Sequence, residues 1–176
     1  MKKYAILLLF LVSISSCKKI DKLTQFDIDL ENNVTIRASI PINTPLDIPT
    51  PPISTNSEDT FDNNNTSKDL IEKAILKKMK LTITNPSRGN FDFIKNIEIY
   101  ISADNLPEVK MAWKLNHTND GKNTLNLDTS SDDLQEYIKK NQINIRVRTT
   151  TDEILTQDYD VKIEYTFSID AEILGI

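Results

Sequence analysis

The sequence predicts a mainly β fold: a two-layer antiparallel β-sandwich with two short helices in its connections. Runs of alternating apolar and polar residues recur about eight times, as expected of strands with one buried and one solvated face. Turn-forming pairs such as Asp120-Gly121 separate these runs. The chain has only three glycines and one cysteine, which excludes Gly-rich phosphate loops and an internal disulfide. An immunoglobulin-like topology and a partly closed barrel remain open as arrangements of these strands.

The first residues have the layout of a secretory signal. Lys2 and Lys3 precede an unbroken apolar run, residues 5–12, which is shorter than the ~20 residues a membrane-spanning helix needs. The segment Ile-Ser-Ser-Cys that ends at Cys17 resembles the lipobox of bacterial lipoproteins, including small Bacteroidetes lipoproteins; no specific domain family is recognised. The resemblance implies cleavage before Cys17 and a diacylglyceryl group, with palmitate-type chains, on its thiol. The alternative is an ordinary signal peptide followed by an incidental cysteine.

This interpretation divides the chain into three parts. We expect a lipoprotein signal peptide at 1–16, a tether at 17–24 and a single β-sandwich domain at 25–176. Two or three acyl chains anchor a soluble domain stably, since each buried CH₂ contributes ~0.8 kcal/mol. In lipoproteins of this kind, an aspartate directly after the lipidated cysteine resembles an inner-membrane retention signal. This chain has Lys18 at that position, so the resemblance favours the cell outer membrane. The periplasmic and the surface-exposed side both remain open.

Charge excludes one class of partner. Removing Lys2 and Lys3 from the 21 basic residues leaves 19 against 26 acidic ones, a net charge of −7. An acidic chain is repelled by phosphate backbones, so we expect no nucleic-acid partner. The expected partners are the membrane, through the lipid on Cys17, and a protein or glycan of the cell envelope.

The first half of the domain mixes clear and irregular elements. Residues 26–30 and 34–40 alternate apolar and polar side chains, and Asn32-Asn33 between them predicts a hairpin turn. The region 41–66 begins with a proline-rich strap, Pro41–Ile53, expected to lie extended on the fold, and continues as a polar, mobile loop. Leu70, Ile71, Ala74 and Ile75 then predict a helix over 67–78, which leads into a strand at 80–84.

The second half consists mainly of strands. Alternation predicts strands at 97–101, 109–115, 142–151 and 159–171. The Asp120-Gly121 pair predicts a hairpin between the strand 109–115 and the apolar residues Leu125 and Leu127. A second helix is expected after Ser130 or Ser131, since acidic residues at its start and lysines at its end suit the helix dipole.

Catalytic constellations are missing from the sequence. His117 is the only histidine, so a cluster of several histidines around a metal cannot form, and we expect a solvated loop residue. The acidic pairs 58–59, 132–133 and 152–153 fit solvated surfaces, because adjacent carboxylates point apart. We therefore expect no catalytic residues and no enzyme activity, with a carboxylate-based hydrolase as the alternative.

No cofactor and no metal site are expected, with calcium as the alternative. β-Sandwich loops can gather oxygen ligands for calcium. The candidate ligands are Asp104, Asn105, Asp120 and Asp132.

Aromatic residues decide whether the domain has a ligand-facing surface. Trp113 shares its parity with Val109 and Met111 and is expected in the core. Tyr100 falls between Ile99 and Ile101, on the opposite face of its strand, and is the one candidate ligand-facing residue. The sequence thus favours a non-enzymatic binding or structural module, with glycan binding or an apolar-ligand cavity as alternatives.

Overall fold

Two antiparallel sheets packed face to face form the domain, which confirms the predicted β-sandwich. The computed structural model describes residues 24–38, 41–55, 61–64 and 66–172. The first sheet has the order β1 (Gln25–Ile36), β9 (Tyr159–Ala171), β4 (Ile71–Asn85) and β7 (Thr124–Thr129). The second sheet has the order β6 (Leu106–Lys114), β5 (Ile94–Ala103), β8 (Gln142–Thr151) and β2 (Leu46–Pro49), with β3 (Ile53–Ser54) also paired to β8.

The strand order is that of a jelly roll. Pairing is nested along the chain: β1 pairs with β9, β2 and β3 with β8, β4 with β7, and β5 with β6. This nesting places β9 beside β4 in one sheet and β8 beside β5 in the other, as in two interlocked Greek keys. The immunoglobulin-like alternative is wrong, because that topology would place β1 beside β2 rather than β9.

One side of the sandwich is closed by a short junction. Strands β6 and β7 pair only at Ala112–Thr129 and Trp113–Asp128, and they belong to different sheets along the rest of their length. The predicted hairpin centred on Asp120-Gly121 is present, since both pairs are symmetric about residues 120 and 121, but residues 115–123 form a longer connection than a two-residue turn and carry the chain from one sheet to the other. This junction gives the sandwich some of the character of the partly closed barrel.

The core lies between the sheets and is built from the inward faces of the strands. Buried aliphatic and aromatic side chains come from both sheets, with Phe167, Leu81, Ile99 and Val147 each no more than 1% exposed. The predicted strands at 142–151 and 159–171 match β8 and β9. Their strict alternation is what places one side-chain face on the core and the other in solvent.

The predicted hairpin at the start of the domain is wrong. β1 is one continuous strand that pairs with β9 without a register shift. Asn32, expected in a turn, lies mid-strand, and its side-chain Oδ1 accepts a hydrogen bond of 2.6 Å from the buried Tyr165 hydroxyl. A buried hydroxyl needs a partner, which explains an asparagine on an otherwise apolar strand face.

The predicted helix over 67–78 is also wrong. A short 3₁₀ turn, η2 (Lys68–Leu70), leads directly into β4. Register shifts against β9 between Ile71 and Lys73 and between Leu76 and Lys78 insert extra residues. These bulges change the spacing of the buried side chains from two to three, so the apolar pattern resembles that of a helix.

The strap is extended, as predicted, but part of it is a strand. β2 and β3 pair with β8 at the edge of the second sheet. Pro49 is tolerated there because the missing N–H of a proline in an edge strand breaks no hydrogen bond between central strands. The mobile loop expected up to residue 66 is wrong for its described end. Phe61 is 1% exposed and packs edge-on against Phe26, with ring centroids 5.6 Å apart.

The second predicted helix is present but shorter. It is α4 (Gln135–Ile138), and its buried Tyr137 and Ile138 close one end of the core. The side-chain oxygen of Asp133 accepts hydrogen bonds from the backbone of Gln135 and of Ala74, each 3.0 Å long. This carboxylate ties the helix to β4 and satisfies a free N–H of its first turn.

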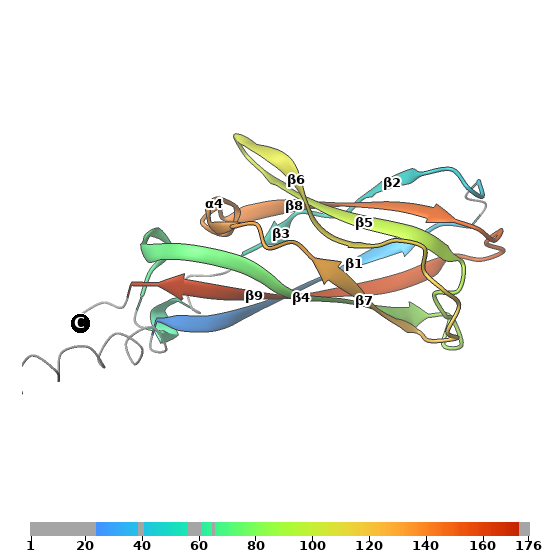
Figure 1. Ribbon diagram of the computed structural model, residues 1–176, viewed down its shortest axis with the longest axis horizontal. Helices are drawn as coiled ribbons and strands as arrows, with labels where there is room; N and C mark the ends of the chain where they lie inside the picture. The colour runs from blue at the N-terminus through green and yellow to red at the C-terminus, as the bar shows by residue number, and fades with distance from the viewer. Residues whose placement is uncertain (1–23, 39–40, 56–60, 65, 173–176) are drawn as a thin grey trace, which may run out of the picture.

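The connections gather at two opposite ends of the sandwich. Residue 24 lies beside Ala171, where β1 begins and β9 ends, while residues 86–93, 115–123 and 152–158, the distal loops, lie at the other end (Figure 1). The predicted signal peptide, Cys17 and most of the tether lie outside the described residues. No helix within the described parts of the chain is long and apolar enough to cross a membrane.

Candidate binding face

A β-bulge turns the only tryptophan toward solvent. In the register of β5 against β6, Ile99 pairs with Ala112 and Tyr100 with Lys110, so Met111 is an extra residue. Met111 and Ala112 are both fully buried, and the parity of β6 reverses after them. The expectation that Trp113 lies in the core is therefore wrong: its side chain is half-buried on the outer face of the sheet.

Trp113 thereby joins Tyr100 on one surface. Cross-strand pairing sets Trp113, Glu98 and Arg148 side by side on β6, β5 and β8. The next outward row contains Lys110, Tyr100 and Arg146 on the same three strands. We call these six residues the aromatic face. The structure places the candidate residue Tyr100 at its centre, on the outward face that the sequence predicted.

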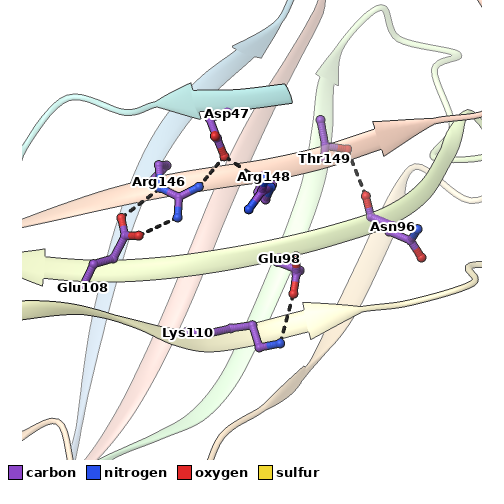
Figure 2. A network of polar contacts seen from close by, with 8 residues as sticks. All are labelled: Asp47, Asn96, Glu98, Glu108, Lys110, Arg146, Arg148 and Thr149. Carbon is purple, nitrogen blue, oxygen red and sulfur yellow. Dashed lines mark hydrogen bonds and ion pairs between the residues drawn. The ribbon is translucent and has the colours of Figure 1, made fainter. Parts of the chain in front are cut away.

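Arg146 is the hub of the polar contacts on this face (Figure 2). Its guanidinium makes a bidentate pair with Glu108 of β6, in which Nε lies 2.9 Å from Oε2, and it also contacts the Asp47 carboxylate of β2. Its Cζ lies 4.2 Å from the centroid of the Tyr100 ring, a cation–π contact. Arg146 therefore ties the edge strand β2 to β6 across the width of the sheet.

Hydrogen bonds hold charged side chains on and beside the aromatic face in their ionised forms. Hydrogen bonds from Arg146, supported by its positive charge, lower the pKa of Glu108. The Glu108 carboxylate in turn raises the pKa of Arg146. Lys110 donates a 3.0 Å hydrogen bond to Glu98, which raises the pKa of that lysine. A general acid in a carboxylate hydrolase needs a raised carboxyl pKa, and Glu108 shows the opposite shift.

Two cations on this face have capacity left for a ligand. Arg148 has an exposed side chain, and its Nε lies 3.8 Å from Oδ1 of Asp47. The Lys110 ammonium sits 5.5 Å above the Trp113 ring. Aromatic rings beside hydrogen-bond donors and acceptors give a surface that can stack on a flat ligand and bind its polar edges.

The outer face of the first sheet is built differently. Glu164 on β9 lies between Lys80 and Lys162, at 3.3 and 3.0 Å, and Lys77 pairs with Asp27 at 2.7 Å. Hydrogen bonds from Lys162 and Lys80 lower the pKa of Glu164. A shallow hollow of about 480 Å³ on this face is lined mainly by charged and polar side chains. The aromatic side chains of its four strands point inward or pack against the core.

The candidate calcium ligands do not converge. Asp104 and Asn105 form the turn between β5 and β6, and Asp132 precedes α4, whereas Asp120 lies among the distal loops at the other end. His117 lies in a loop, as expected, but it is partly buried rather than fully solvated. Its backbone N–H bonds Lys95 of β5, and its side chain lies near Asp92 and Asp120. No spacing in the sequence announces this cluster, since Asp92 and His117 lie in different loops.

Comparisons with known proteins add little to this description. No protein-family model matches the chain, and no curated protein sequence matches it. Among solved structures, a chain from Desmodium yellow mottle tymovirus is similar with a TM-score of 0.24 and 10% sequence identity. The likeness covers 86% of this chain and 91% of that chain, and at this TM-score it supports no conclusion about function.

Proposed function

We propose that this chain is a lipid-anchored protein of the cell envelope that acts as a non-enzymatic binding module. The lipid would be carried by Cys17, and the outer membrane would be its site. The ligand would be held against the aromatic face. The observation that carries the proposal is the pair of outward aromatic rings, Tyr100 and Trp113, set among charged side chains on one sheet.

The aromatic face favours a ligand with flat apolar surfaces and many polar edges. Sugar rings have that character, and so do peptide segments with aromatic side chains. Glu98, Lys110 and Arg148 supply donors and acceptors beside the rings. A glycan of the envelope is therefore the first candidate, and a protein of the envelope is the second.

Anchoring is tested separately from binding. The natural protein should fractionate with membranes and carry a diacylglyceryl mass on residue 17 by mass spectrometry. Cys17→Ala should remove both properties and leave the thermal unfolding temperature unchanged, because it alters none of the buried side chains of the described core. A natural protein that fractionates with soluble proteins and carries no lipid mass would overturn the anchoring proposal.

Binding is tested with a fluorophore that the chain already contains. Trp113 is the only tryptophan, so its emission reports directly on the aromatic face. We expect envelope oligosaccharides to shift this emission in a saturable way in the Cys17→Ala protein. Tyr100→Ala should weaken binding about tenfold or more, since stacking on an aromatic ring contributes roughly 1–3 kcal/mol.

A matched control lies on the other sheet. Ile75 is an outward apolar residue of β4, and Ile75→Ala should leave binding unchanged. Equal losses from Tyr100→Ala and Ile75→Ala would mean that the aromatic face is not the site. Saturable binding of solubilised envelope proteins, with no response to oligosaccharides, would identify the ligand as a protein.

A further inference from the structure

Three side chains with metal-ligating atoms meet among the distal loops. Asp92 comes from the connection between β4 and β5, while His117 and Asp120 come from the connection between β6 and β7. Each offers one ligand atom, and these atoms lie within 4.8 Å of one another. Two separate connections thus place an imidazole and two carboxylates around one point, close enough for small rotations to bring them to a single ion.

The backbone holds this arrangement in place. Oδ1 of Asp92 accepts hydrogen bonds of 2.9 Å from the N–H groups of both Asp120 and Gly121. The N–H of His117 donates to the carbonyl of Lys95 at 3.0 Å. Only one oxygen of Asp92 is used in these bonds, so the other oxygen is left for a ligand.

One ring nitrogen of His117 lacks the partner that a buried polar atom needs. Its Nε2 has less than 1 Å² of exposed surface and has no hydrogen-bond partner in the described structure. A buried nitrogen of this kind is normally satisfied by a donor, an acceptor or a metal ion. The unpartnered Nε2 is an observation that does not depend on the positions of the two carboxylates.

The cluster is also open to solvent on one side. His117 and Asp120 line a surface hollow of about 290 Å³, together with Lys122. The Lys122 ammonium lies 2.8 Å from Oδ2 of Asp120 and so sits where a cation is attracted. The lysine side chain is 66% exposed and can rotate into solvent when an ion takes its place.

We propose that Asp92, His117 and Asp120 form a binding site for a divalent transition-metal ion of the zinc class. Imidazole nitrogen with carboxylate oxygen is a ligand set that zinc accepts, whereas calcium and magnesium prefer oxygen alone. Three protein ligands leave a fourth position, which faces the hollow and is available to water or to a group on a ligand. The site lies at the end of the sandwich opposite the start of β1, a strand about 40 Å long at ~3.3 Å per residue.

The chain is well suited to a direct test, because it has one histidine and one cysteine. Protein carrying Cys17→Ala and a purification tag without histidine has neither a thiolate nor a second imidazole to bind metal. Zn²⁺ should bind with 1:1 stoichiometry by calorimetry and shift the single imidazole resonances in ¹⁵N NMR spectra. Co²⁺ should give a visible absorption band that Zn²⁺ removes.

Substitutions distinguish a metal-binding role of these residues from a purely structural role in the loops. Asp92→Asn keeps an oxygen that can accept the bonds from residues 120 and 121, and Asp120→Asn keeps the side-chain shape. Each should lower zinc affinity about tenfold or more without changing the unfolding temperature of the metal-free protein. His117→Gln should abolish the Co²⁺ band, whereas Asp132→Asn, an exposed acid outside the cluster, should change neither affinity nor band.

Two results would overturn the proposal. One is an imidazole spectrum that does not respond to Zn²⁺ or Co²⁺. The other is zinc binding that Asp132→Asn weakens as much as Asp92→Asn does, which would mean diffuse attraction to an acidic surface.

Discussion

The two outer faces of the sandwich use the same strand geometry for different purposes. The face of β1, β9, β4 and β7 is an ion-paired surface, in which lysines alternate with carboxylates such as Glu164. The face of β6, β5, β8 and β2 instead carries Tyr100 beside Arg146 and Trp113 beside Lys110. A solvated sheet needs only polar outward residues, so the outward aromatics on one face alone are the basis of the proposed binding role.

The difference between the faces depends on one bulge. If β6 ran through Met111 with regular alternation, Trp113 would face the core and Ala112 would face solvent. The first sheet also contains bulges, in β4, but there they leave lysines on the surface. A local irregularity of the ladder therefore decides which face carries Trp113.

Deleting Met111 is expected to have the largest effect. Removing Met111 leaves Lys110 and Ala112 adjacent, so regular alternation keeps Ala112 inward and Trp113 outward. The loss is that of the fully buried Met111 side chain, roughly 2–5 kcal/mol. Urea unfolding should show this loss, whereas the emission of Trp113 should remain that of a half-exposed ring. Deleting Asn119, in the distal loop 115–123, should be tolerated better. An emission that moves to that of a buried ring after the Met111 deletion would contradict the bulge explanation.

Arg146→Met is expected to have the next largest effect. Methionine keeps part of the packing on Tyr100, but Glu108 and Asp47 lose their shared cation, for a loss of about 1–2 kcal/mol. The matched change on the other face is Lys162→Met, which removes a screened surface pair with Glu164 and should destabilise less than Arg146→Met. Urea midpoints with unchanged m-values measure both. Equal losses would show that the two faces do not differ in their polar networks.

Acid should reduce the effect of Arg146→Met. The pKa of Glu108 in the folded protein is lowered below its ordinary value of 4.5, chiefly by hydrogen bonds from Arg146. A lowered folded pKa gives stability that is present above the ordinary value and is lost as pH falls through the folded pKa. The difference in unfolding temperature between natural and Arg146→Met protein should therefore be constant near neutrality and shrink below about pH 4.5. A difference that grows in acid would contradict this sign.

Lys110→Met should have the smallest effect on stability. It removes an exposed pair with Glu98 and the contact with the Trp113 ring, together worth about 0.5 kcal/mol. The emission of Trp113 should change measurably, because a charge near the ring is lost. The control Lys80→Met, on the opposite face, should leave the emission unchanged. Identical spectra for both variants would place Lys110 away from the ring.

The longest and most regular strands could be predicted well from the sequence. The alternation over residues 142–151 and 159–171 identifies β8 and β9, because each places a continuous apolar face on the core. The same reasoning located Tyr100 on an outward face. It failed at β4 and at Trp113, where bulges change the period, and at Asn32, where the partner is a distant tyrosine hydroxyl.

The amino-acid sequence by itself determined that this is an antiparallel β-sandwich, because the period-two burial of apolar side chains is a local property of each strand. The tertiary structure alone decided the jelly-roll order, the outward position of Trp113, and the meeting of Asp92 with His117 and Asp120. Each of these depends on which strands pair and in what register. That choice is made by the packing of residues far apart in the chain, and a single strand carries no mark of its partner.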